Sequence, residues 1–370
     1  SGYPAPNEVW ILSKGTLLSH VCLRLLSDGS AECAFKQNTI LIFRLTLKTA
    51  IIRPFFIYNP QKVRSKKMTN HKLKMWWETA RPKTLPLALA SIFTGSALAY
   101  WADKESFNLT VMLLCLLTTI LLQVLSNFAN DYGDHQKGSD TEERIGPLRG
   151  IQQGAISANE LKWGLILMAV GAFFSGAFLI GIAYQSLTDL LAFAGLGILA
   201  IIAAITYTVG AKPYGYLGLG DLSVLLFFGL LGVGGTYYLQ THSIDSLITL
   251  PALGSGLLAT AVLNINNLRD IEQDAKVGKN TLVVRIGPKK GRIYHCILLS
   301  VAALCYVLFA SSTAFSPWHF LFLLAFPLLL KHALFVYRSK EPTVLRPMLA
   351  QMSMISLFIN ILFSLGLLIG

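Results

Sequence analysis

The feature that most constrains this chain is a succession of nine long apolar stretches between Thr84 and Gly370. Each is close to the about 20 residues that a helix needs to cross a bilayer. None carries an ionisable residue near its middle. Backbone polar groups in hydrocarbon must be satisfied within the segment, so helices are expected. We therefore predict an all-α membrane protein whose nine transmembrane helices cover about 84–101, 109–129, 162–184, 189–209, 220–240, 247–266, 293–312, 317–336 and 348–369.

The composition excludes an ordinary soluble protein. Charged residues make up 14% of the 370 residues, against about 25% in soluble domains. The formal charge of +12 does not indicate a nucleic-acid partner, because residues 1–67 supply +7 of it and the rest lies beside the spans. Lysine and arginine there set topology and contact anionic lipid. The five cysteines form no CxxC pair, so neither a zinc site nor a disulfide framework is predicted.

Residues 1–67 do not resemble the rest of the chain. Their one apolar run, 39–58, is interrupted by Arg44, Lys48 and Arg53. Each charge near a helix centre costs about 2.5 to 3.5 kcal/mol on insertion, so this run is not expected to span. We predict that 1–67 is a poorly ordered N-terminal extension or an artefact, without an assigned function. A basic, acid-poor targeting peptide is the alternative. Residues 68–370 then form the membrane domain.

The loops predict the orientation of the spans. Fourteen lysines and arginines lie in the loops that follow the second, fourth, sixth and eighth spans, whereas the other loops contain only Lys104. Positively charged loops stay on the cytoplasmic side. We therefore expect the N-terminus and these loops in the cytoplasm, and the C-terminus on the opposite side.

The second span ends in a first acidic motif, Asn127-Phe-Ala-Asn130-Asp131-Tyr-Gly-Asp134, with Asp140 in the loop beyond it. Asn127, Asp131 and Asp134 are spaced i, i+4 and i+7, so they share one helical face.

The sixth span ends in a second motif, Asn266-Asn-Leu-Arg269-Asp270-Ile-Glu-Gln-Asp274. Asp270 and Asp274 are again four residues apart, with Asn266 one turn earlier. Both motifs follow an even-numbered span, so they are predicted to open on the same side of the membrane.

Carboxylates gathered on one face repel each other, and partial burial increases that cost. A hard cation such as Mg²⁺ removes both problems, because it takes oxygen ligands and often shares them with substrate phosphates. We predict Asp131, Asp134, Asp270 and Asp274 as metal ligands and catalytic residues. Acids in loops beside basic residues are otherwise solvated or in surface pairs, but two such clusters at equivalent helix ends favour the metal. Diphosphate-binding candidates are Arg81, Lys83, Lys137, Arg149, Arg269 and Lys279, with Asn127, Asn130 and Asn266.

The segment Tyr207-Thr-Val-Gly-Ala-Lys212-Pro-Tyr214-Gly-Tyr216 follows the fourth span and is rich in glycine, proline and tyrosine. Glycine and proline at this density predict a shaped turn. Its aromatic rings either belong to an interfacial belt or form a wall of the site, where ring faces stabilise a cation.

At these residues the chain resembles the UbiA-type intramembrane prenyltransferases. The segments that carry the resemblance are 81–86, 130–140, 146–150, 212–216 and 266–274, with Gly278, Lys279, Thr281 and Leu282. The residues in these segments most resemble those of the 1,4-dihydroxy-2-naphthoate polyprenyltransferase branch, which acts in menaquinone biosynthesis. One departure is Gly138, which stands where the family's first motif often has its last aspartate, and this puts Asp140 as a ligand in doubt.

The resemblance implies nine helices around a central cavity that opens to the cytoplasmic side of a bacterial inner membrane. It also implies Mg²⁺-dependent transfer of a polyprenyl group from polyprenyl diphosphate to 1,4-dihydroxy-2-naphthoate, with loss of diphosphate and CO₂, giving demethylmenaquinone. Tyr132 or Tyr207 would shield the allylic cation from water.

Three alternatives remain open. The first is a related prenyltransferase that uses another acceptor, such as 4-hydroxybenzoate, haem or a chlorin. The second is a CDP-alcohol phosphotransferase, whose DGxxAR-type motif is absent here. The third is a transporter. Carriers generally place ionisable groups near the bilayer midplane, and these spans have none there.

Overall fold

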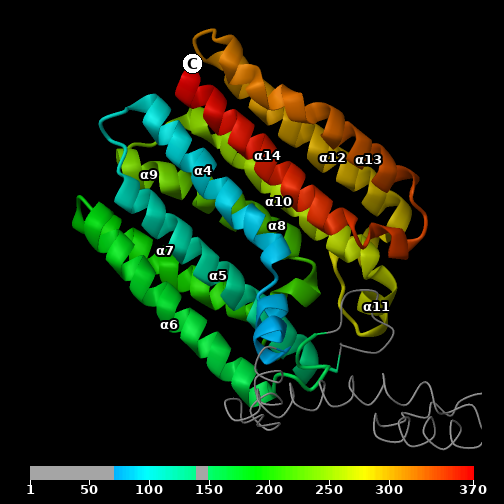
Figure 1. The fold of residues 1–370 in the computed structure, drawn as a ribbon. Helices are drawn as coiled ribbons and strands as arrows, with labels where there is room; N and C mark the ends of the chain where they lie inside the picture. Colours follow the sequence, from blue (N-terminus) through cyan, green and yellow to red (C-terminus); the bar gives the residue numbers. More distant parts are fainter. Residues whose placement is uncertain (1–70, 139–148) are drawn as a thin grey trace, which may run out of the picture. The chain divides into compact units, whose positions relative to one another are not determined.

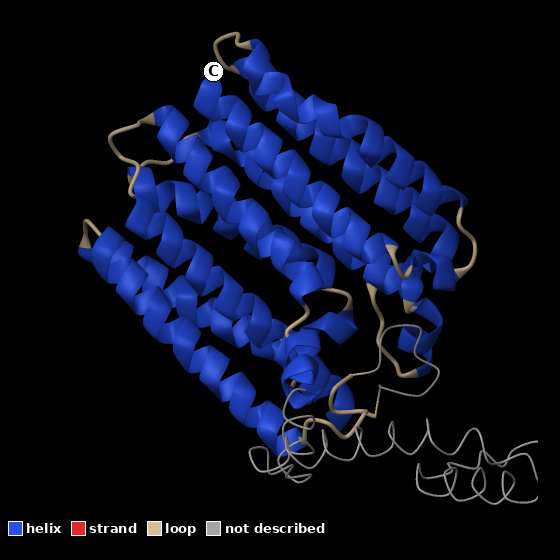
Figure 2. Cartoon of the chain, in the orientation of Figure 1, coloured by secondary structure: helices blue, strands red, loops and turns tan. Residues whose placement is uncertain are grey.

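The computed structural model describes residues 71–138 and 149–370. The predicted extension over 1–67 and the loop residue Asp140 lie outside these described residues. Within them, nine helical segments are long and apolar enough to cross a bilayer, and Figure 2 shows helices joined by loops. This confirms the prediction of an all-α protein with nine spans.

In chain order the elements are η1 (Pro82–Thr84), α4 (Leu85–Ala102), α5 (Leu109–Gln136), α6 (Ala158–Ala183), α7 (Leu187–Thr206), η2 (Tyr214–Leu217), α8 (Gly220–Val224), η3 (Leu225–Gly235), α9 (Thr236–Thr241), η4 (Ser246–Ile248), α10 (Thr249–Arg269), α11 (Ile271–Lys276), α12 (Leu282–Ser312), η5 (Pro317–Ala325), α13 (Phe326–Arg338), η6 (Pro342–Leu345) and α14 (Met348–Ile369).

Several helices extend beyond their apolar stretches, and the extension of α5 carries the first acidic motif. Helix α5 continues to Gln136, so the whole first motif is helical. The seventh span starts earlier than predicted, at Leu282, but it breaks at Gly287, whose φ of 82° is in the left-handed region. Glycine tolerates that conformation, and Pro288 cannot continue the preceding helix.

Helices α4, α10 and α14 are the most buried spans, whereas α7 is the least buried. Figure 1 shows α12 and α13 on one side of these three and α5, α6 and α7 on the other. The inner helices use small residues at their contacts, for example Ala88, Gly95 and Ala99 of α4. In lipid, close approach of backbones replaces the hydrophobic effect as the driving force for helix packing.

A buried amide links three of these helices. The side chain of Asn360 in α14 accepts hydrogen bonds from Thr94 of α4 at 2.6 Å and from Tyr306 of α12 at 2.8 Å. Its own nitrogen donates to the carbonyl of Ser356. The oxygen and the nitrogen of this amide therefore both have hydrogen-bond partners, as a polar side chain at this depth requires.

The fifth span is not a continuous α-helix. It consists of α8, an eleven-residue π-helix (η3) and α9. Its glycines pack directly on the neighbouring backbones. A Cβ at Gly229 would lie 2.7 Å from the carbonyl oxygen of Ala252, and one at Gly95 would lie 2.5 Å from that of Val233. The span therefore fits between α4 and α10 only because these positions lack side chains.

Candidate active site

A cavity of about 340 Å³ lies among α4, α5, α6, α7, η3 and α10. Where α5, α10 and α11 end, its wall is polar and contains side chains of both acidic motifs. Along α6 and α7 the wall is apolar or small. The polar lining includes Arg81, Thr84, Gln123, Ser126, Asn127, Asn130, Asp134, Arg149, Tyr207, Thr208, Asn266, Asn267, Asp270, Gln273, Asp274 and Lys279. The cavity thus joins a charged mouth to a hydrocarbon-like interior.

The first motif presents one buried helical face, as its spacing predicts. Asn127, Asp131 and Asp134 are all buried on α5. The Asn127 amide donates to the carbonyl of Ala80 at 2.9 Å and to the Thr84 hydroxyl at 3.2 Å. Asn127 therefore fixes the turn between the helix over 71–79 and α4, in addition to lining the cavity.

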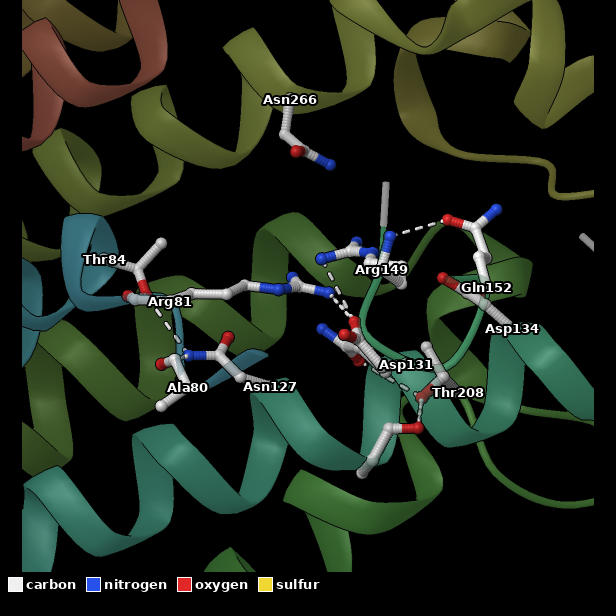
Figure 3. A network of polar contacts seen from close by, with 12 residues as sticks. Ala80, Arg81, Thr84, Asn127, Asp131, Asp134, Arg149, Gln152, Thr208 and Asn266 are labelled. Atoms are coloured by element: carbon white, nitrogen blue, oxygen red, sulfur yellow. Dashed lines mark hydrogen bonds and ion pairs between the residues drawn. The ribbon is translucent and has the colours of Figure 1, made fainter. Parts of the chain in front are cut away.

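Two arginines converge on Asp131 (Figure 3). The Oδ1 atom of Asp131 pairs with the Arg81 guanidinium and lies 3.1 Å from Nη1 of Arg149. Asp131 is fully buried, so these charges offset the cost of placing a carboxylate there. Its Oδ2 atom has no hydrogen-bond partner.

Arg81 has an unusual backbone conformation. Its φ of 54° and ψ of 63° place a non-glycine residue in the left-handed region, immediately before η1. Such conformations cost free energy and cluster at functional sites. Here the turn directs the long side chain of Arg81 from the start of α4 towards α5 (Figure 3).

The end of α7 packs tightly against the first motif. The Thr208 hydroxyl donates to the Ala129 carbonyl at 2.9 Å and to the Asn130 side chain at 3.1 Å. A Cβ at Gly133 would lie 2.6 Å from the Thr208 carbonyl oxygen. The glycine within the motif is therefore required by the close approach of two backbones.

In the second motif one continuous helix does not reach the last aspartate. Helix α10 ends at Arg269, Asp270 occupies the junction, and α11 follows. The backbone amide of Asp274 still donates to the Asp270 carbonyl at 2.8 Å. The two aspartates therefore keep the i, i+4 hydrogen bond of an α-helical turn.

Arg269 is directed at its own motif. Its Nε donates to Oδ1 of Asp270 at 2.7 Å, and Nη2 donates to Oδ2 of Asp270 and, at 2.8 Å, to Asn266. Arg269 is buried and does not line the cavity. Its contacts are those of a counter-ion for Asp270.

Tyr216 and Lys279 connect the two motifs. The Tyr216 hydroxyl donates to Oδ1 of Asp134 at 3.0 Å, and Nζ of Lys279 lies 5.6 Å from the Tyr216 ring centroid. The same Nζ is 3.5 Å from Oδ1 of Asp274. Asp134 of the first motif and Asp274 of the second are therefore joined through one tyrosine and one lysine.

The electrostatics agree with this proximity. Burial raises the pKa of Asp274 to about 6; Lys279 opposes the shift, and the charges of Asp270 and Asp134 add to it. Burial lowers the pKa of Lys279, but Asp274, Asp134 and Asp270 outweigh burial and the net shift is upward. Three of the four predicted carboxylates thus share one electrostatic environment.

The carboxylates of the two motifs are suitable ligands for a divalent cation, although they are not arranged as a complete coordination shell. In the described part of the chain, no three His, Cys, Asp or Glu side chains are grouped as metal ligands. The Oδ2 atoms of Asp131 and Asp274 are nevertheless buried without a hydrogen-bond partner. Carboxylate oxygens with unused lone pairs are what Mg²⁺ binds.

Other predicted residues lie elsewhere. Lys83 and Lys137 are exposed and do not line the cavity, and Nζ of Lys137 lies 4.7 Å from the centroid of the Tyr216 ring. Tyr132 packs in a separate hydrophobic cluster with Trp76 and Phe128. It follows Asp131 directly, so it points about 100° away from it around the helix, and its position gives a shielding role no support. Tyr207 does line the cavity, with its ring edge-on to Tyr214 at 5.3 Å.

Some residues of the mouth were not selected as site residues from the sequence. Thr84, Gln123, Thr208, Asn267 and Gln273 all line it. Asn267 and Gln273 lie within the second motif, so proximity to the aspartates was the available signal. No sequence pattern marks Thr208 as a site residue, because its contact with α5 depends on how α7 ends.

Comparison with known proteins gives a consistent result. Residues 88–360 match the UbiA prenyltransferase family. The chain is 81% identical over 308 residues to a 1,4-dihydroxy-2-naphthoate octaprenyltransferase of Haemophilus influenzae, covering 83% of this chain and 100% of the relative. It is 53% identical over 296 residues to the Escherichia coli protein of the same name, covering 80% and 96%.

Solved structures show the same fold. A UbiA homolog from Aeropyrum pernix K1 matches with a TM-score of 0.57 at 15% identity, covering 78% of this chain and 98% of that one. A UbiA homolog from Archaeoglobus fulgidus, bound to DMAPP and Mg²⁺, matches with a TM-score of 0.50 at 16% identity, covering 76% and 98%.

Proposed function

Because the chain belongs to the UbiA prenyltransferase family, we propose that it transfers a polyprenyl group from polyprenyl diphosphate to 1,4-dihydroxy-2-naphthoate. Diphosphate and CO₂ are lost, and the immediate product is the hydroquinone demethylmenaquinol, which a separate two-electron oxidation converts to demethylmenaquinone. The relatives at 81% and 53% identity support this donor and acceptor. The observation that carries the proposal is the cavity itself, whose charged mouth suits a diphosphate and whose apolar interior suits a prenyl chain.

The carboxylates of the mouth suit a diphosphate only with a cation. Asp131, Asp134, Asp270 and Asp274 would hold Mg²⁺, a role supported by the orphaned Oδ2 atoms and by the Mg²⁺ in the Archaeoglobus fulgidus homolog. When bound, Mg²⁺ neutralises charge on the leaving diphosphate.

Arg81, Arg149 and Lys279 line the same mouth. Arginine suits phosphate because its planar fork donates two parallel hydrogen bonds. In this proposal the first two leave Asp131 and bind the outer phosphate oxygens, and Lys279 adds a third positive charge. Arg269 acts on the diphosphate only indirectly, by holding Asp270 in place.

The chemical step breaks the carbon–oxygen bond of the donor, and its electron pair leaves with the diphosphate. The allylic cation is then attacked by the electron-rich naphthoate ring, and the carboxyl group departs as CO₂. Tyr207 presents a half-buried ring to the cavity, where it stabilises the cation and excludes water.

We further propose that the protein resides in a bacterial inner membrane with its N-terminus and the cavity mouth in the cytoplasm. The excess of basic residues in the even-numbered loops supports this orientation. The C-terminus lies at the other end of the bundle from α11 (Figure 1), and in this orientation it is on the opposite side of the membrane.

The test is mass spectrometry of the product formed by the purified full chain with Mg²⁺ and one labelled polyprenyl diphosphate. Dihydroxynaphthoate and 4-hydroxybenzoate are offered together. We expect a prenylated, decarboxylated naphthalene product from the wild type and none from Asp131→Asn, which should purify with the same elution profile. Prenylation of 4-hydroxybenzoate alone, or full activity of Asp131→Asn, would overturn the assignment.

A further inference from the structure

We propose that Gly197, at the middle of α7, sets the length of prenyl chain that the cavity accepts. This inference rests on the proposed function, because it concerns the donor of that same site. It assigns the prenyl tail a path along α7, away from the charged mouth.

One face of α7 forms a wall of the cavity. Phe193, Gly197, Ala200 and Ala204 all line it, and their spacing of i, i+4, i+7 and i+11 places them on one side of the helix. Tyr207, which follows the helix, lines the mouth. The α7 wall therefore runs from the charged end towards the other side of the membrane. Between Tyr207 and Phe193 it is lined by the small residues Ala204, Ala200 and Gly197, together with Leu196.

Gly197 is the position where an added side chain would enter the cavity instead of colliding with protein. A Cβ built on Gly197 meets no atom within 4 Å. Gly232 and Gly235 also line the cavity, but a Cβ there would lie 2.9 Å from Ser91 and 3.3 Å from Leu231. An added side chain at either of those two glycines would require its neighbours to shift, whereas Gly197 leaves free space.

The part of the cavity wall formed by α5 and α6 is held in place. Thr118 of α5 and Gly176 of α6 line the cavity, and the Thr118 hydroxyl is hydrogen-bonded to that of Ser175 at 2.8 Å. A large side chain at 197 would therefore reduce the open space, because this pair links α5 to α6.

The depth of Gly197 predicts where a blocked chain would end. Ten residues separate it from Tyr207, which corresponds to about 15 Å along the helix. An extended isoprene unit adds four carbon–carbon bonds of about 1.5 Å each, or roughly 5 Å of length along the chain. About three units therefore fit between the mouth and Gly197, and longer chains must pass it.

The experiment compares wild type with Gly197→Trp and with Gly195→Trp. Gly195 is also free of atoms within 4 Å but is exposed and does not line the cavity, so it controls for a tryptophan on α7. Both changes replace glycine by a better helix former. Donors of two, three and eight isoprene units are assayed for turnover with Mg²⁺, and their binding is measured without acceptor by thermal shift.

We expect Gly197→Trp to use the two-unit donor within about twofold of wild type and the eight-unit donor roughly tenfold less well or worse, because overpacking blocks the path. Gly197→Leu should fall between them, and Gly195→Trp should match wild type with every donor. Equal binding and use of the eight-unit donor by Gly197→Trp would overturn the inference. The binding measurement decides this even if naphthoate proves to be the wrong acceptor, which would contradict the proposed function alone.

Discussion

Replacing Arg269 by methionine distinguishes a counter-ion from a diphosphate ligand. The sequence predicts that Arg269 contacts the substrate, because it lies beside two aspartates. In the structure its guanidinium donates to both oxygens of Asp270 and to Asn266. Arg269 is 6% exposed and Asp270 is 8% exposed, so water compensates little of what the substitution removes.

The magnitude follows from this burial. Removing one partner of a buried ion pair leaves an uncompensated charge and costs about 3 to 5 kcal/mol. At the about 2 to 4 °C per kcal/mol that applies to domains of roughly 150 to 250 residues, taken as an upper guide for this longer chain, Tm should fall by roughly 10 °C. Methionine retains much of the side-chain volume, so the loss reports mainly on the charge. Lys83→Met, at an exposed position outside the cavity, should leave Tm unchanged.

The assay is thermal unfolding of the purified variants in detergent, combined with steady-state kinetics. The double variant Arg269→Met with Asp270→Asn removes both charges and should recover most of the lost Tm, although not the turnover, because Asp270 is a proposed metal ligand. Arg269→Met with an unchanged Tm and a raised KM for the prenyl diphosphate would refute the counter-ion role. It would restore the sequence-based prediction of a direct substrate contact.

Three other perturbations probe the same region. Tyr216→Phe keeps the ring but removes the donor to Asp134, so kcat/KM should fall roughly tenfold, the worth of one hydrogen bond to a charged group; unchanged kinetics would contradict this. EDTA should abolish turnover until Mg²⁺ is restored, yet leave Tm unaltered, because arginines already neutralise two of the four carboxylates; a large fall in Tm would count against that reasoning. Gly133→Ala should lower the free energy of unfolding by about 1 to 3 kcal/mol, because its Cβ would lie 2.6 Å from the Thr208 carbonyl oxygen. Gly181→Ala has open space around the new Cβ and should leave the free energy of unfolding unchanged. Urea titration of both variants measures the difference.

The spans and the shared face of the first motif were predictable because both depend on local spacing. Nine apolar stretches of sufficient length can only be helices in lipid. The i, i+4, i+7 spacing of Asn127, Asp131 and Asp134 keeps its meaning because α5 remains helical to Gln136. That both motifs lie on the same side of the membrane also follows from their positions at the ends of even-numbered spans, whereas their meeting in one cavity depends on how the helices pack.

The direction of individual basic side chains was not predictable. Lys83 and Lys137 are as close in sequence to the motif residues as Arg81 and Arg149 are, but only the two arginines reach Asp131. The difference arises from the left-handed turn at Arg81 and from the way the chain returns at Arg149, neither of which leaves a sequence pattern. The contact between Tyr216 and Asp134 joins residues 82 apart, so it depends on tertiary packing.

The π-helix in the fifth span has a consequence for how this chain tolerates changes of length. An α-helix that loses one residue rotates everything beyond it by about 100°, which would turn its inward face towards lipid. Segment Leu225–Gly235 instead holds wider turns than an α-helix needs. A single-residue deletion there can be absorbed by tightening one turn, leaving α8 and α9 in register with their neighbours. Within a bundle packed this closely, gaps in the alignment of homologous chains should therefore concentrate in that segment.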